Sequence, residues 1–199
     1  MSKYTSLTDS ELLMKIKKFD SRALEEIYDR YSTLLYTLVF KIVAEKDIAE
    51  KIIVNLFGII WKKSSQINFE KGSGYTWLVL LARNLAVDFM QRKNGNTKSE
   101  YNTEYEDYFI FPHLAEGIDD LDYFTAKNIL PKLKSAYHNL TDAQKYVIDL
   151  AFYSGYNLEQ IAKELNIPVE TVRSKIMTSL QNLRDNLLSG EVNSGEING

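Results

Sequence analysis

The sequence contains no cysteine, which excludes disulfide bonds, thiolate metal sites and cysteine nucleophiles. Its only two histidines, His113 and His138, stand far apart, so they indicate neither a metal site nor a catalytic triad. No apolar run approaches the roughly 20 residues that a membrane-spanning helix needs, and the first ten residues lack a signal-peptide core. We therefore expect a cytoplasmic protein with no metal, no cofactor and no membrane insertion. An enzyme is the least favoured class, because the titratable residues form no convergent set.

What the 199 residues do contain is enough apolar side chain, 45% of the total, to fill one core or two small ones. The apolar residues recur at intervals of three and four rather than two, which predicts helices and not strands. Charge is divided along the chain: residues 1–93 carry 15 Lys/Arg against 11 Asp/Glu, residues 94–130 carry 2 against 8, and residues 131–199 carry 7 against 8. The expected fold class is all-α, with two small helical domains joined by an acidic linker.

The first domain is expected over residues 1–93. A capping box at Thr8 and Glu11 starts the first of its four helices, because each of these side chains can satisfy a backbone amide of the opening turn. The helices are predicted from there to near Asp20, from about Ser21 past Leu38, from about Asp47 to Ser64, and from the end of a loop at 66–74 to Lys93.

A different composition begins at Asn94. Residues 94–123 are rich in Asn, Asp, Glu and Tyr, contain Pro112 and Gly117, and have no sustained period, so we expect a disordered linker. A second helical domain is predicted over residues 124–188. The tail, residues 189–199, is expected to be disordered.

The second domain has the pattern of a helix-turn-helix. Thr141 and Gln144 form another capping box, and Asn157 caps a shorter helix that ends at the turn Asn166-Ile167-Pro168. The long helix that follows places Thr171, Arg173, Ser174 and Lys175 on its polar face, where such residues can meet base edges and phosphates in a major groove. A plain helical hairpin with a solvated face is the alternative, since this geometry also occurs in proteins that do not touch DNA.

Longer stretches resemble a known family. LTDAQKYVIDLAFYSGYNLEQIAKELNIPVETVRSKIMTSLQNLR resembles region 4, the promoter-reading domain, of extracytoplasmic-function (ECF) sigma factors, although alone it also fits a response-regulator output domain. ALEEIYDRYSTLLYTLVFKIV, DIAEKIIVNLFGIIWKK and GSGYTWLVLLARNLAVDFMQRK resemble successive parts of region 2 of the same family, in order. Together the two blocks cover about two thirds of the chain.

The resemblance implies an alternative sigma factor whose partners are promoter DNA and the beta and beta-prime subunits of bacterial RNA polymerase core. Residues 1–93 would bind the core and melt the minus-ten element, holding a flipped base at an energetic cost that stacking and hydrogen bonds offset. Residues 124–188 would read the upstream element. By position, the resemblance assigns minus-ten contacts to Phe69, Lys71, Ser73, Tyr75, Arg83, Asn84, Arg92 and Lys93, upstream contacts to Asn157, Glu170, Thr171, Arg173, Ser174 and Lys175, and core contacts to Glu50, Lys51, Asn55 and Phe57. Trp77 is expected to pack in the core instead.

The sequence also departs from the family's usual wording. Lys51 and Asn55 stand where the core-docking helix usually has acids, and Val54 stands where it has a glutamine. Few cations follow Lys175, so we expect weak binding to DNA alone. Three regulatory modes stay open: an autonomous sigma factor released by an anti-sigma factor; a sigma factor delivered by a DNA-targeting recruiter, such as a nuclease-inactive RNA-guided CRISPR effector; and a sigma-like regulator without core binding.

Overall fold

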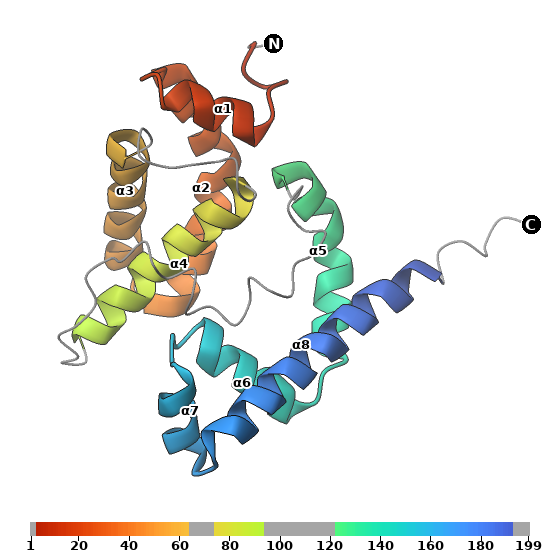
Figure 1. Cartoon of the computed structure of the whole chain (residues 1–199). Helices are drawn as coiled ribbons and strands as arrows, with labels where there is room; N and C mark the ends of the chain where they lie inside the picture. The colour runs from red at the N-terminus through yellow and green to blue at the C-terminus, as the bar shows by residue number, and fades with distance from the viewer. Residues whose placement is uncertain (1–2, 64–73, 94–121, 193–199) are drawn as a thin grey trace, which may run out of the picture. The chain divides into compact units, whose positions relative to one another are not determined.

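The computed structural model describes residues 3–63, 74–93 and 122–192, with side chains up to Leu187. Over these ranges the chain forms eight α-helices and no strand, which confirms the all-α prediction (Figure 1). The chain divides into two compact units between Thr125 and Ala126.

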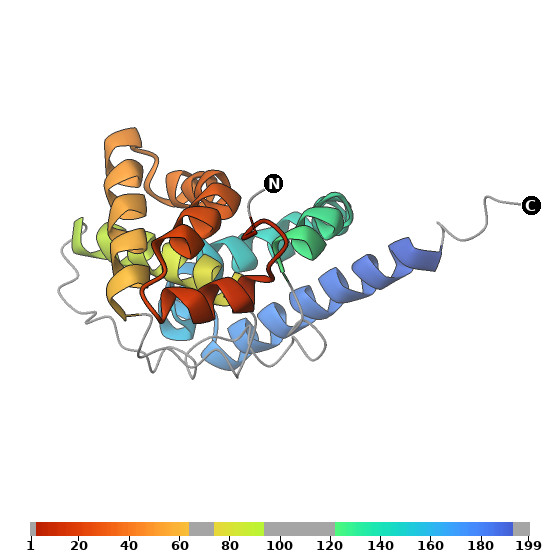
Figure 2. The same cartoon turned by 90° about the horizontal axis from the view of Figure 1, so that it is seen from above.

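The first unit is built around one long central helix. Helix α2 (Ser21–Val43) packs against α1 (Asp9–Ile16), α3 (Lys46–Lys63) and α4 (Gly74–Lys93), and α3 also packs against α4 (Figure 2). The apolar face of each helix points inward, as the three-and-four spacing requires. The fully buried large side chains of this core are Leu12, Leu13, Ile16, Ile27, Tyr31, Leu35, Leu56, Ile60, Leu78 and Leu81.

The starts of α1 and α2 are fixed by side-chain caps. The Thr8 hydroxyl accepts a hydrogen bond from the Glu11 amide at 3.2 Å, and Glu11 accepts one from the Thr8 amide at 2.8 Å. Asp20 caps α2 by accepting from the amides of Arg22 and Ala23. Such caps are each worth about 1 kcal/mol. The capping box predicted at Thr8 is therefore confirmed.

Helix α1 ends at Ile16, so the expectation that it continues to near Asp20 is wrong. The Asp20 amide donates back to the Lys15 carbonyl at 3.1 Å, and the Phe19 amide donates to the Ile16 carbonyl at 2.8 Å. This pair of bonds defines a Schellman motif, with Phe19 in the left-handed position at φ 60°. Glycine is usual there, and a side chain costs about 1 to 2 kcal/mol. Sequence spacing could not place the stop, because phenylalanine is an unexpected residue at it.

Helix α4 begins where it crosses α1 closely. A Cβ atom added at Gly74 would lie 2.6 Å from Cδ1 of Leu13, which is closer than real contacts allow. The glycine therefore lets the first turn of α4 approach the buried face of α1.

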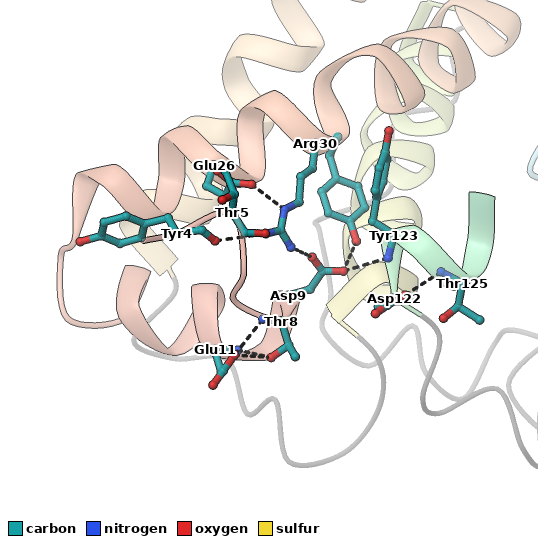
Figure 3. Close-up of polar contacts among 11 residues, drawn as sticks. Tyr4, Thr5, Thr8, Asp9, Glu11, Glu26, Arg30, Asp122, Tyr123 and Thr125 are labelled. Atoms are coloured by element: carbon teal, nitrogen blue, oxygen red, sulfur yellow. Dashed lines mark hydrogen bonds and ion pairs between the residues drawn. The ribbon is translucent and has the colours of Figure 1, made fainter. Parts of the chain in front are cut away.

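A buried ion pair ties α1 to α2. Nη1 of Arg30 lies 3.0 Å from Oδ1 of Asp9, and both side chains are almost fully buried (Figure 3). The Arg30 guanidinium also binds Glu26 at 2.8 Å and the carbonyl oxygens of Tyr4 and Thr5 at 3.2 Å. The guanidinium is thus well supplied with acceptors, as a buried charge requires.

The other carboxylate oxygen of Asp9 holds a distant part of the chain. Oδ2 accepts hydrogen bonds from the Tyr31 hydroxyl and, at 3.0 Å, from the backbone amide of Tyr123. The Tyr123 ring lies edge-on to Tyr31, and the Arg30 guanidinium lies 5.5 Å from the centroid of the Phe124 ring. Residues 122–125 therefore belong to the first unit, although residues 122–123 were expected in the linker and residues 124–125 in the second domain. The rest of that expected linker, residues 94–121, lies outside the described residues.

The second unit contains most of α5 (Tyr123–His138), with α6 (Asp142–Phe152), α7 (Leu158–Leu165) and α8 (Val169–Val192). Helix α8 packs against both α6 and α7. The predicted capping box at Thr141 and Gln144 is present. Because α8 continues to Val192, the tail expected to be disordered from Ser189 is instead helical over its first four residues; extending an established helix is cheap. Residues 193–199 lie outside the described ranges.

Candidate nucleic-acid interface

Helices α7 and α8 form the predicted helix-turn-helix. The turn begins at Asn166, which adopts the left-handed conformation at φ 52°, and the Ile167 amide donates to the Ala162 carbonyl at 3.0 Å. Asparagine tolerates this conformation better than most residues. Pro168 follows, and its carbonyl accepts from the Val172 amide at 3.2 Å in the first turn of α8. The turn is therefore short and well defined.

The predicted recognition face is displayed on a firmly held helix. Val172 and Ile176 of α8 are fully buried, and Ile161 of α7 is buried against the same core. Between the two buried positions of α8, the side chains of Arg173, Ser174 and Lys175 are all exposed. A helix anchored in this way can enter a groove without ordering its backbone first.

The other three residues predicted to contact the upstream element differ in how exposed their side chains are. Glu170 is exposed and Thr171 is half-buried. The Asn157 side chain accepts a hydrogen bond from the Gln160 amide at 2.8 Å, so its oxygen is used to cap α7. Met177, which sequence reasoning missed, is 45% exposed one turn beyond Arg173. The sequence spacing could have identified Met177, because position 177 lies four residues after 173 and therefore on the same helix face.

Cations predicted to meet phosphates already have acidic partners. Nε of Arg173 lies 3.5 Å from Glu170, and Nη2 of Arg92 lies 2.7 Å from Asp88. Lys93 at the end of α4 forms an ion pair with Glu45. These pairs are exposed and individually weak. Each must nevertheless open, at least in part, before its cation can neutralise a phosphate.

The minus-ten residues are only partly within the described ranges. Phe69, Lys71 and Ser73 lie outside them. Tyr75 is half-buried, with its ring 5.9 Å from that of Tyr31, and burial raises the pKa of its hydroxyl. The ring thus packs on the core instead of standing free on the surface.

Two adjacent α4 residues predicted to contact the minus-ten element interact with each other. Arg83 is only 4% exposed, and its Nη1 donates to Oδ1 of Asn84 at 2.9 Å. The burial leaves Arg83 little surface with which to meet a phosphate and gives it a role in orienting Asn84. Trp77 is half-buried against the core, as expected.

The exposed face of α3 carries three of the four predicted core-binding residues. Glu50, Lys51 and Asn55 are exposed, whereas Phe57 is 8% exposed and packs against Tyr28 with ring centroids 4.9 Å apart. Val54, at 74% exposure, is the most exposed large apolar side chain on this face. It lies in a shallow hollow with Asp47, Glu50, Lys51 and Asn55. The sequence departures in this helix are therefore surface changes, not core changes.

In the described ranges, no group of three or more Asp, Glu or His side chains could hold a metal ion. None of the described helices is both long enough and apolar enough to cross a membrane.

The chain is similar in sequence to known sigma factors. The family model "Sigma-70, region 4" matches residues 137–185, which include α6 and α7 and most of α8. The ECF RNA polymerase sigma factor SigK of Mycobacterium bovis (strain BCG / Pasteur 1173P2) is 25% identical over 174 residues, covering 87% of this chain and 90% of that protein. SigK of Mycobacterium sp. (strain JLS) is 23% identical over 182 residues, covering 89% and 90%.

A solved structure, that of Rhodobacter sphaeroides SigE in complex with the anti-sigma ChrR, has a TM-score of 0.48 and 24% identity, covering 89% of this chain and 97% of that chain. The region 4 match coincides with the helix-turn-helix, and the SigK similarity extends across both units. In sequence the chain is therefore similar to alternative sigma factors of the ECF family along most of its length.

Proposed function

We propose that the chain binds the core of bacterial RNA polymerase through the exposed face of α3 and directs it to promoters read by both units. The observation that carries this proposal is the α7–α8 pair, in which Arg173, Ser174 and Lys175 stand exposed between two fully buried anchors of one helix. Arginine and lysine can pair bidentately with guanine, and the serine hydroxyl can donate to or accept from a base edge. In this proposal the chain binds DNA and polymerase and catalyses no reaction of its own.

Core binding is assigned to the hollow on α3. Glu50, Lys51 and Asn55 surround Val54 there, so a partner helix would bury one apolar side chain inside a ring of polar ones. A small apolar centre with a polar rim is the usual anatomy of a specific protein interface. Lys51 and Asn55 then favour a partner surface with acidic or neutral groups opposite them.

Minus-ten recognition is assigned to residues along α4 and to the segment before it. Asn84 is held by Arg83 and is half-exposed, so it can hydrogen-bond an unstacked base. Phe69, Lys71, Ser73 and Tyr75 would complete this site, with Arg92 and Lys93 on the phosphates. In this proposal the domain that melts DNA comprises residues 1–93 together with the docked residues 122–125.

Delivery by a second DNA-targeting protein is the alternative to an autonomous mode, and one observation is compatible with it. Three cations assigned to DNA contacts, Arg92, Lys93 and Arg173, are each paired with a carboxylate. Opening these pairs subtracts from the affinity that counterion release provides. A tethered recruiter can offset weak intrinsic binding by raising the local concentration to about the millimolar range. An anti-sigma factor is the other candidate regulator.

Pull-down of the tagged chain from its native host tests this function in the cytoplasm, where polymerase and chromosome meet. We expect the beta and beta-prime subunits together with a second DNA-binding protein. Val54→Glu should reduce recovery of polymerase without unfolding the chain, because Val54 is 74% exposed. Lys127→Ala, on the exposed side of α5, is the matched control. If Val54→Glu recovers as much polymerase as the unmodified chain, the α3 face is not the core-binding surface. If no variant recovers polymerase, the proposed function is refuted.

A further inference from the structure

Helix α8 carries one apolar side chain in the middle of its predicted recognition face. Met177 is 45% exposed and lies one helical turn after Arg173 and Ser174, at the intervals of three and four residues that share a helix face. Gln181, one turn further on, is exposed on the same face. Met177 is therefore an apolar side chain among polar ones.

The neighbours of Met177 along α8 leave its side chain outside the core. Ile176 is fully buried, and Leu180 is 9% exposed. Ser179 is also buried, and its hydroxyl donates a hydrogen bond to the Lys175 carbonyl at 2.7 Å. These positions belong to the stripe with which α8 packs on α6 and α7. Since that stripe is complete without Met177, the methionine is available to a ligand of the recognition face.

The placement of Met177 gives its exposure a meaning. A single exposed apolar side chain is ordinary on a protein surface. Here, however, the two residues one turn before it, Arg173 and Ser174, are assigned to base edges. A thioether offers no hydrogen-bond donor and no charge, so it suits neither a phosphate nor the polar edge of a base. The C5-methyl group of thymine is the apolar feature that a major groove presents to such a side chain.

The spacing along α8 fixes how far apart the contacts of Arg173 and Met177 are. Four residues advance an α-helix by about 6 Å, and successive base pairs are about 3.4 Å apart. Met177 therefore reaches a base pair that is about one or two steps from the one that Arg173 contacts. Its unbranched side chain with a polarisable sulfur can adapt to the exact position of a methyl group.

We infer that Met177 is a specificity-determining residue for the upstream element, because its thioether end packs on the C5-methyl group of a thymine near the contact of Arg173. Met177 selects thymine by an apolar contact, whereas Arg173 and Ser174 contribute charge and hydrogen bonds. The inference rests on the proposed function, since it takes α8 to be the helix that enters the major groove.

Replacing thymine by deoxyuridine removes only the methyl group, so it isolates this contact. Target-promoter fragments that carry deoxyuridine at one upstream-element thymine at a time, on either strand, are titrated with reconstituted holoenzyme in a gel-shift assay. We expect one of these replacements to weaken binding about fourfold, which corresponds to the burial of about one methyl group. With Met177→Ala, the same replacement should have no effect. Met177→Leu, which keeps an apolar side chain, should restore most of the penalty.

A second methionine provides the matched control. Met14 is 49% exposed on α1, in the other unit, and Met14→Ala should keep the penalty of about fourfold. Met177→Ala is not expected to unfold the second unit, because it places the best helix-forming residue at an exposed helix position.

The inference is overturned if no deoxyuridine replacement weakens binding. It is also overturned if the penalty is equally large with Met177→Ala, since the methyl group would then act through the shape of the DNA. Arg173→Ala/Lys175→Ala in the same assay separates this failure from that of the proposed function. If this double variant binds weakly while every deoxyuridine is tolerated, the Met177 inference alone fails. If the double variant binds as tightly as the unmodified chain, the reading role of α8 fails as well.

Discussion

The backbone amide of Tyr123 donates a hydrogen bond to the carboxylate of Asp9, a residue 114 positions earlier. The same carboxylate neutralises Arg30, so one buried group holds α1, α2 and the start of α5 together (Figure 3). Because this carboxylate joins parts of the chain that are far apart in sequence, we expect its removal to lower the stability of the first unit.

We expect Asp9→Ala to destabilise the first unit by about 3 kcal/mol, because the Arg30 charge would lose one of its two buried carboxylate partners. Glu26 remains bound to the guanidinium, which keeps the effect at the lower end for a broken buried pair. Urea unfolding followed by tryptophan fluorescence measures it cleanly, since both tryptophans, Trp61 and Trp77, belong to this unit. Asp29→Ala, which removes an exposed carboxylate of α2, should change stability by less than about 0.5 kcal/mol.

The free chain should bind promoter DNA too weakly to detect at roughly physiological salt. We expect binding to appear with polymerase core, or with core and a recruiting protein. A gel-shift titration of the purified chain checks this. Tight, sequence-specific binding by the chain alone would contradict the prediction and restore the autonomous mode.

Releasing the paired cations should strengthen that weak binding. Glu170→Gln and Asp88→Asn together free Arg173 and Arg92 from their ion pairs. With two more phosphates neutralised on duplex DNA, the salt slope should steepen by about 1.8. The exposed pair Glu25→Gln/Asp29→Asn, with the same change of charge on α2, serves as the control. An equal gain from both double variants would show that net charge, and not pairing, limits binding.

Arg173→Ala/Lys175→Ala should reduce transcription from a target promoter. The expected loss of promoter-binding free energy is about 1 to 3 kcal/mol for a residue that pairs with a base edge. Lys163→Ala, an exposed cation of α7 away from the recognition face, provides the comparison. Run-off transcription with reconstituted holoenzyme is the measurement. Unchanged output from the double variant would reject α8 as the reading helix.

A titration in the second unit gives a prediction at alkaline pH. Burial and the hydrogen bond to Asp149 raise the pKa of Tyr137 to about 12. Since the folded chain keeps this proton more tightly than the unfolded chain, the stabilisation is complete below the ordinary tyrosine pKa of about 10 and is lost as pH rises toward 12. Tyr137→Phe should therefore be less stable than the unmodified chain at neutral pH and approach it at about pH 12. Amide exchange in α6 against pH follows this difference, and a constant gap would contradict it.

Helix starts were predictable because caps are local signals. The residue types at Thr8, Thr141 and Asn157, each with its partner three positions later, predict the start of a helix, and all three caps are present. The stop of α1 was not predictable, since it depends on a phenylalanine in a conformation that favours glycine. The Asp9–Tyr123 contact was equally hidden, because nothing local links the two positions.

The candidate site was predictable in part. Exposure of Arg173, Ser174 and Lys175 follows from the spacing of their buried neighbours on α8. The pairing of Arg173 with Glu170, and of Arg92 with Asp88, was readable from intervals of three and four residues, although the sequence argument overlooked it. The pairing of Lys93 with Glu45 joins two helices and required the tertiary structure.

Because residues 122–125 pack on the first unit, the acidic stretch before them is flanked on both sides by residues of that same unit. Its preceding residue, Lys93, ends α4, and its following residues bind Asp9, so both of its ends lie on the same unit. The described residues on both sides of positions 94–121 therefore belong to the same unit, and the chain passes from the first unit to the second inside α5. A single residue inserted between Tyr123 and Ala136 would shift every later position of α5 around its axis.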